Sequence, residues 1–134
     1  MLTPPDKYEV KETKTGIYWI EDDGILVSVP FKDAPKLSIE ESKQQMLDFM
    51  EEFQNQKFCM LMDAHVNQQT SKEEREFSDE WLPKVVLALA VIVYNPLGKM
   101  MVNMYLGLKP PPYPLKMFGP NEVEKAKDWL RTYL

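Results

Sequence analysis

Two short, unbroken apolar runs constrain the fold of this 134-residue chain most strongly. Residues 58–62 (FCMLM) end at Asp63, and residues 88–94 (ALAVIVY) end at an Asn-Pro pair. Each run is shorter than a typical buried helix, and neither shows the alternation of a strand with one face in water. We therefore predict two β-strands that are covered on both faces, as the strands of parallel sheets usually are.

The segments around these two strands predict the remaining elements. The Asp23-Gly24 pair joins residues 16–21 to residues 24–30 and predicts a β-hairpin, because such pairs adopt the positive φ of a tight turn. Residues 8–13 are expected to form a short edge strand, and residues 115–118 a short last strand. Cap residues, helical apolar spacing and Pro or Gly stops predict four helices, at residues 38–53, 71–82, 97–108 and 123–133.

This order of elements predicts an α/β fold. A hairpin followed by alternating helices and strands calls for a mixed β-sheet with a parallel portion and helices packed on its faces. The length suits one domain. We expect residues 7–134 to form that domain, and residues 1–6 to form a flexible N-terminal arm.

Cysteine content and the apolar runs predict a cytoplasmic protein. Cys59 is the only cysteine, so no disulfide can form within the chain. The first residues lack the basic and apolar segments of a secretory signal. The longest apolar run, residues 85–93, has nine residues, whereas a membrane-spanning helix needs about 20. We expect neither export by that route nor a transmembrane segment.

Charge is distributed unevenly along the chain. The net charge of −5 argues against non-specific binding to nucleic acid. Residues 1–83 carry 9 Lys and Arg against 18 Asp and Glu, whereas residues 84–134 carry 7 against 3. Solvated helix faces explain such a pattern. The alternative is a bipolar surface that orients self-association or a charged partner.

Several strings, taken in order, resemble one family. They are the hairpin turn at Asp23-Gly24 and residues 61–63 (LMD), 88–96, 114–118 and 126–130. Together they make the chain similar to the SpoIIAA-like proteins with the STAS-type fold, within a branch of small uncharacterised bacterial proteins. The resemblance spans nearly the whole chain from Tyr8. It implies a mixed sheet surrounded by helices, and a regulatory role in binding a protein partner rather than in catalysis.

The resemblance also raises the question of phosphorylation. In the anti-sigma-factor antagonists of this fold, a serine is phosphorylated at the helix start after a core strand, within an Asp-Ser-Ser/Thr-Gly string. Here Asp63 is retained, but the adjacent serine and the glycine are absent. Thr70 and Ser71 are the hydroxyl residues at the helix start and hence the candidate phosphorylation sites. The alternative is that one of them is a plain helix N-cap.

The candidate catalytic groups do not form a recognisable site. His65 is the only histidine and follows Asp63 closely, and Cys59 invites a Cys-His-Asp arrangement. On an extended segment, however, Cys59 and His65 are about 20 Å apart. One His and one Cys cannot complete a zinc site. The five glycines form neither a dinucleotide fingerprint nor a P-loop. We therefore expect no metal or cofactor, and an enzyme using Asp63 and His65 is only the third hypothesis.

The favoured binding surface combines the loop after Asp63 with the helix at residues 97–108. From the loop we select Asp63, His65 and Asn67, and from the helix Met101 and Tyr105. The many apolar residues of this helix cannot all face inward at 100° per residue, so we also expect homodimerisation. The alternative function is a carrier of a small apolar ligand or lipid between this third helix and the sheet. CRAL-TRIO lipid carriers, which have a related strand–helix order, support that alternative.

Overall fold

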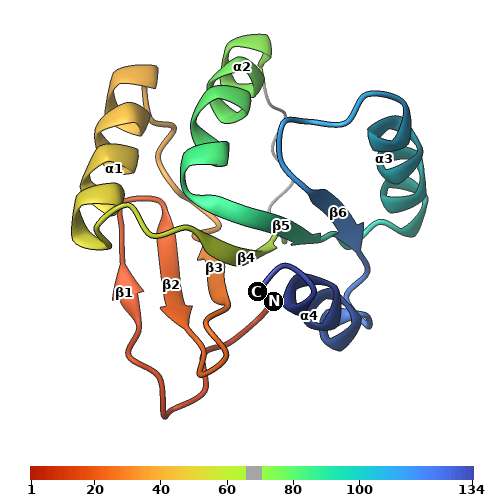
Figure 1. The fold of residues 1–134 in the computed structure, drawn as a ribbon, viewed down its shortest axis with the longest axis horizontal. Helices are drawn as coiled ribbons and strands as arrows, with labels where there is room; N and C mark the ends of the chain where they lie inside the picture. The colour runs from red at the N-terminus through yellow and green to blue at the C-terminus, as the bar shows by residue number, and fades with distance from the viewer. Residues whose placement is uncertain (66–70) are drawn as a thin grey trace.

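The computed structural model describes residues 1–65 and 71–134, and leaves aside the side chains of Met101, Tyr105 and Leu106. It confirms an α/β fold with a six-stranded mixed sheet and four α-helices in the described part (Figure 1). The strands are β1 (Lys11–Glu12), β2 (Gly16–Ile20), β3 (Leu26–Pro30), β4 (Phe58–Asp63), β5 (Val86–Ile92) and β6 (Leu115–Phe118). The helices are α1 (Ile39–Glu52), α2 (Lys72–Trp81), α3 (Pro96–Leu108) and α4 (Val123–Arg131), with a 3₁₀ turn, η1 (Leu82–Lys84).

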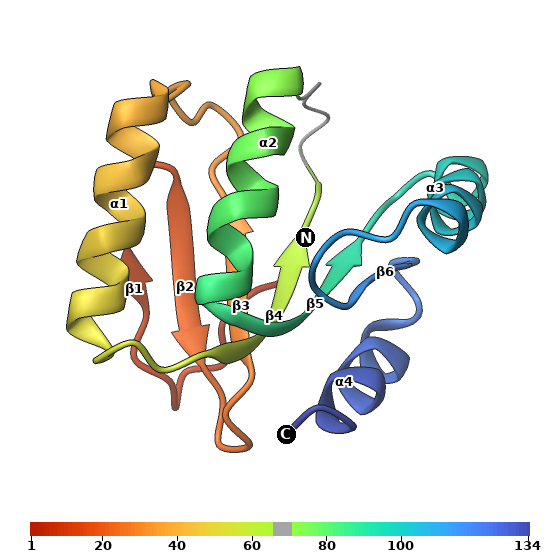
Figure 2. The same ribbon diagram turned by 45° about the horizontal axis from the view of Figure 1, so that its top comes forward.

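The six strands lie side by side in the order of the sequence. Strands β1, β2 and β3 pair antiparallel, whereas β3, β4, β5 and β6 pair parallel. The helices between the parallel strands are therefore crossover connections. Figure 2 shows α1 and α2 together on one face of the sheet, with α3 beyond the β6 edge. Helix α4 packs on the other face, against β4, β5 and β6.

The apolar run of β4 lies between two covering layers, as its sequence predicts. Cys59 and Leu61 are fully buried in the core that includes Ala126 and Leu130 of α4. Met60, which alternates with them, packs on the opposite side against the cluster of Tyr18, Leu26 and Phe58. The two-residue period of the strand thus explains why every position in the run is apolar.

The boundaries of four strands differ from those predicted. The hairpin connection is wider than a two-residue turn, because β2 ends at Ile20 and β3 begins at Leu26. Within it Gly24 has φ of +90°, and its N–H donates to the Glu21 carbonyl at 2.8 Å. The expected edge strand shortens to Lys11–Glu12. Strand β5 begins at Val86 rather than at residue 88, because Val86 already pairs with Phe58.

The N-terminal arm lies against the domain at Leu2. The backbone N–H of Leu2 donates to Asp63 at 2.5 Å, and its side chain packs on the main core. The segment 1–6, expected to be a flexible arm, is therefore attached to the domain through Leu2. No helix in the described parts of the chain is long and apolar enough to cross a membrane.

The uneven charge is partly neutralised inside the fold. Lys127 of α4 forms an ion pair with Glu21 at 2.8 Å, and both side chains are largely buried. Arg131 of α4 pairs with Asp23 at 3.0 Å. The basic C-terminal helix thus docks on the acidic turn of the hairpin, and these charges are used within the chain.

Candidate functional site

Asp63, predicted as a binding residue, is fully buried at the end of β4. It accepts hydrogen bonds from the Leu2 N–H at 2.5 Å and from the Tyr94 hydroxyl at 2.9 Å. Burial and the hydrogen bond to Asp63 raise the pKa of Tyr94 to about 12. Both carboxylate oxygens thus have partners, and Asp63 joins the N-terminal arm to the residues that follow β5.

His65 is directed away from Asp63. Its Nε2 lies 2.7 Å from the Pro30 carbonyl, so that nitrogen carries the proton and donates. The histidine, expected in an exposed loop, is half-buried. It joins the segment after β4 to the end of β3, and within the part of the chain that the structure describes it shares no hydrogen-bond partner with Asp63. This arrangement does not bring the two residues together as an acid–base pair.

Cys59 is an inert core residue. Its thiol is fully buried and lies 3.3 Å from the Leu130 carbonyl, to which it donates. Burial raises the pKa of the Cys59 thiol, so the reactive thiolate is disfavoured. Within residues 1–65 and 71–134, no three His, Cys, Asp or Glu side chains are grouped so that they could hold a metal ion.

Ser71 acts as the N-cap of α2. Its hydroxyl accepts from the Glu74 N–H at 3.1 Å and also contacts the Glu74 carboxylate at 3.1 Å. A phosphate on Ser71 would therefore meet a carboxylate that already occupies the capping position. Asn67 and Thr70, the other two residues selected from this loop, lie outside the described residues.

Helix α3 carries an exposed apolar stripe, which we define as Leu97, Met100, Met104 and Leu108. These residues are three or four positions apart and so share one face of the helix. Their exposed fractions are 60%, 54%, 67% and 84%. The prediction that the methionines of this helix cannot all face inward is confirmed for Met100 and Met104. Met101 and Tyr105 lie in α3, but their side chains are outside the description.

Polar contacts at the start of α3 and away from its apolar stripe hold the helix in place. The Asn95 side chain accepts from the N–H groups of Leu97 and Gly98 and so begins the helix. Lys99 pairs with Glu122 at 2.5 Å. The Asn103 amide donates to the carbonyl of Met117 in β6 and accepts from its N–H, each at 3.0 Å. Lys99 and Asn103 lie about a third of a turn from the apolar stripe, which therefore points away from these contacts.

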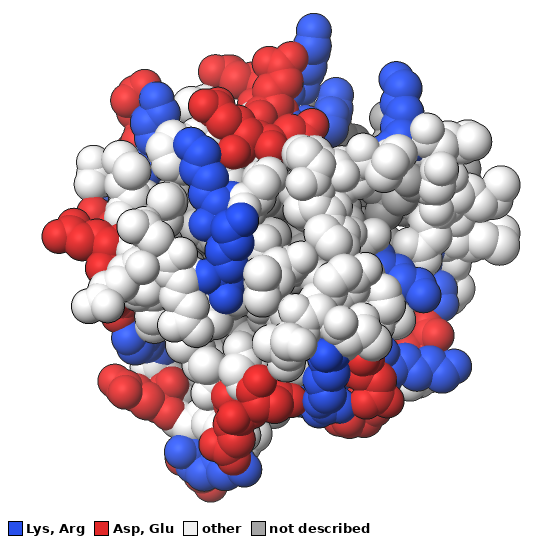
Figure 3. All heavy atoms as spheres, in the orientation of Figure 1, with Lys and Arg blue, Asp and Glu red and all other residues white. Residues whose placement is uncertain are grey.

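Helix α3 has little charge to disturb an apolar contact. Lys99 is its single charged residue and is already paired with Glu122. Figure 3 shows that the surface over α3, at the right of the view, is largely uncharged. Contiguous exposed apolar surfaces of this kind often mark sites of protein–protein interaction.

Sequence reasoning missed three residues that organise this region. Tyr94 was read as the end of a strand, yet it binds Asp63. Asn103 and Leu2 were not selected at all. A single amide in an otherwise apolar helix signals a buried polar contact, so Asn103 could have been found. The 3-4-4 spacing from Leu97 to Leu108 would likewise have revealed the stripe.

Comparisons with known proteins give two findings. A family model described as "Domain of unknown function (DUF7793)" matches residues 18–134. A crystal structure of a protein of unknown function from Arthrobacter sp. FB24 aligns with 91% of this chain and 97% of that chain, at 19% identity and a TM-score of 0.27. A likeness of that degree carries no argument about function. Curated proteins give no significant match.

Proposed function

The chain belongs to the DUF7793 family of domains of unknown function, and we propose that it is a non-enzymatic protein-interaction module that binds its partner through the apolar stripe of α3. The exposure of four large apolar residues on one face of one helix is the observation that carries this proposal. Burying such a face releases water from apolar surface, which is the main driving force of protein association.

The geometry of α3 favours a helical or grooved partner. The stripe is straight and uncharged, and residues at this spacing serve as anchors when a helix docks in an apolar groove. Lys99, Asn103 and Asn95 fix the helix from its other side. The helix is therefore held before binding, which lowers the entropy that association must overcome.

The fold-level part of the proposal is a STAS-like, SpoIIAA-type arrangement. The sequence resemblance and the hairpin followed by alternating helices and strands support it. On this proposal the domain is a cytoplasmic regulatory module of a bacterium. Its loop after β4 and its third helix, rather than a phosphorylated serine, then supply the contact. The capping role of Ser71 supports this choice.

The partners of Asp63 and His65 also support a binding role. Asp63 is occupied by Leu2 and Tyr94, and His65 by Pro30. A general base must lie within hydrogen-bond distance of the substrate proton that it accepts. To do so, Asp63 would have to give up its bond to Leu2 or Tyr94, and His65 its bond to Pro30. A role in binding a partner through α3 leaves these contacts intact, whereas a catalytic role for Asp63 and His65 would require them to break.

The proposal is tested with a photo-cross-linking amino acid placed at position 104, in cells that express the protein natively. We expect one discrete adduct, which mass spectrometry identifies as a protein. Leu97→Ser combined with Leu108→Ser should reduce its yield at least tenfold, because two of the four apolar contacts are lost.

The matched control places the same amino acid at position 47. Leu47 is an exposed apolar residue of α1 (44% exposed) outside the stripe, so it should give little of this adduct. Equal yields from positions 47 and 104, or an adduct unaffected by the double substitution, would overturn the proposed surface.

A further inference from the structure

The two faces of the sheet are packed very differently. Toward α4, residues such as Val27, Cys59 and Leu61 are at most 1% exposed. Toward α1 and α2, Ser28, Met60 and Met62 are only half-buried, although they lie on central strands beneath two helices. Helix α1 has no buried residue at all. The helical layer on this face therefore leaves unfilled space above the sheet.

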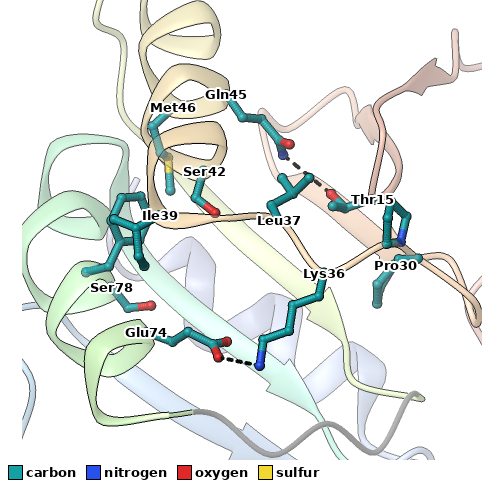
Figure 4. Close-up of a pocket in the computed structure, with 13 residues that line it drawn as sticks. Thr15, Pro30, Lys36, Leu37, Ile39, Ser42, Gln45, Met46, Glu74 and Ser78 are labelled. Carbon is teal, nitrogen blue, oxygen red and sulfur yellow. Dashed lines mark hydrogen bonds and ion pairs between the residues drawn. The ribbon is translucent and has the colours of Figure 1, made fainter.

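That space forms two clefts, which we call together the α1–α2 cleft. One has a volume of about 640 Å³ and lies between α1 and the floor of β2, β3 and β4. The other, of about 500 Å³, lies between α1, α2 and the connection before α1 (Figure 4). They share Thr15, Pro30, Leu37, Gln45 and Met46. Sites for small molecules measure about 300–1,000 Å³, and none of these lining residues belongs to α3.

Helix α1 is attached mainly at its C-terminal end. Phe49 and Phe53 pack with Tyr18 and Phe58, with ring centroids 5.1 to 6.4 Å apart. From its start to its middle the helix lines the cleft, as Figure 4 shows for Ile39 and Met46. Helix α1 therefore has an aromatic anchor at its C-terminal end and open space along the rest of its inner side, so it forms a wall that can adjust to a ligand.

The floor of the cleft is apolar and adaptable, and it contains one hydroxyl without a hydrogen bond to the described residues. Met46, Met60 and Met62 line it, and methionine side chains adapt readily to irregular ligands. Ser28 lies between Tyr18 and Met62 across the sheet. Its hydroxyl makes no hydrogen bond to any of the described residues. A ligand with one hydrogen-bonding group would satisfy it at the centre of the apolar floor.

The charges around the cleft disfavour an anion as the ligand. Four carboxylates line it against two lysines: Glu41, Asp48, Glu52 and Glu74 against Lys14 and Lys36. Lys36 is already paired with Glu74 at 3.3 Å, and Lys14 lies near Glu41, whose pKa it helps to lower. Glu52 is paired with Lys11, which lies outside the lining. The carboxylate of Asp48 then remains without an ion pair among the described residues, and it would repel a carboxylate or phosphate head group.

We propose that the α1–α2 cleft binds an uncharged, largely apolar small molecule whose hydroxyl or carbonyl group hydrogen-bonds Ser28. The entrance can open at low cost, because exposed ion pairs such as Lys36–Glu74 contribute little to stability. The Gln45–Thr15 hydrogen bond, at 3.4 Å, is also long (Figure 4). This site is independent of the apolar stripe of α3.

The test uses Nile red, an uncharged dye that fluoresces in apolar surroundings, with the full chain. We expect Met62→Trp and Met46→Trp, which fill the floor and the wall, each to weaken dye binding at least tenfold. If one of them does not fold, the other decides. Met104→Trp on α3 is the matched control and should change the affinity less than twofold, as should Met100→Ser combined with Met104→Ser.

Competition then identifies the ligand class. 1-Dodecanol should displace the dye at least ten times more effectively than dodecanoate, and Ser28→Ala should weaken dodecanol about fivefold, the loss of one neutral hydrogen bond. Dye binding that is absent, unaffected by both tryptophan variants, or abolished by the α3 double variant would overturn the site. Stronger displacement by dodecanoate would overturn the uncharged ligand.

Discussion

The side-chain amide of Asn103 forms two hydrogen bonds to the backbone of Met117, one as donor and one as acceptor, each at 3.0 Å. Asn103 thereby takes the place of a neighbouring strand along β6, the last strand of the sheet. Unpaired strand edges are sites of aggregation, and proteins cover them with helices or loops. Helix α3 is thus fixed to the sheet edge by one polar residue while its apolar stripe faces outward.

Asn103→Asp should destabilise the protein by about 1–3 kcal/mol, because a carboxylate cannot donate to the Met117 carbonyl. Urea unfolding measures the loss, and hydrogen exchange should quicken at residues 115–118. Asn121→Asp, in the connection before α4, is the control and should change stability by less than about 0.5 kcal/mol. An unchanged unfolding midpoint in Asn103→Asp would show that the two hydrogen bonds between Asn103 and Met117 do not hold α3.

Two tyrosines should make the protein sensitive to high pH. Burial raises the pKa of Tyr94 and of Tyr113 to about 12, with further contributions from Asp63 and Asp79 respectively. Because the folded-state pKa lies above the ordinary value of 10, the stabilisation is complete below pH 10 and is lost as the pH rises toward 12.

Phenolate absorbance checks this prediction directly. In the folded protein Tyr94 and Tyr113 should titrate late, as should Tyr18, whose pKa burial also raises. Tyr94→Phe and Tyr113→Phe should each remove one late-titrating group. The same variants should lose stability less steeply between pH 10 and 12 than the unmodified protein. Replacement of Tyr133, at the C-terminal end, serves as the control. If either replacement leaves the number of late-titrating groups unchanged, the assignment is contradicted.

The ion pair between Lys127 and Glu21 should couple α4 to the hairpin. The two side chains are 17% and 12% exposed, so solvent screens them less than Arg131 and Asp23 at 41% and 30%. A double-mutant cycle with Lys127→Met and Glu21→Gln should give a coupling of about 1–2 kcal/mol, against less than about 1 kcal/mol for the exposed pair. Equal couplings would contradict the role of burial.

These contacts also mark what the sequence could and could not predict. The unbroken run of β4 and the Ser38 capping box of α1 depend on neighbouring residues, so periodicity and spacing located both. Leu2 and Asp63 meet across 61 positions, and Lys127 meets Glu21 only because α4 packs beside the hairpin. Such partners depend on the tertiary arrangement, which local patterns do not encode. The α1–α2 cleft was missed for the same reason, since apolar spacing in α1 predicts a packed face whether or not the face is filled.

Homodimerisation through α3 is the last prediction. A helix of 13 residues is about 20 Å long, and a two-fold axis across the stripe would place Leu97 of one copy near Leu108 of the other. Four side chains supply only part of the roughly 1,200 Å² that stable interfaces bury. We therefore expect a weak dimer, with a dissociation constant in the range of about 10 µM to 1 mM.

Sedimentation velocity over that concentration range should show the sedimentation coefficient rising with concentration. Met100→Ser combined with Met104→Ser should abolish the rise, because each removes apolar surface from the contact. Leu47→Ser, which removes an exposed apolar side chain from α1, should leave it intact. If the protein sediments as a monomer throughout, the stripe does not bind a second copy, and a different protein must cover it. If Leu47→Ser abolishes the rise as well, association is unspecific and the stripe loses its role.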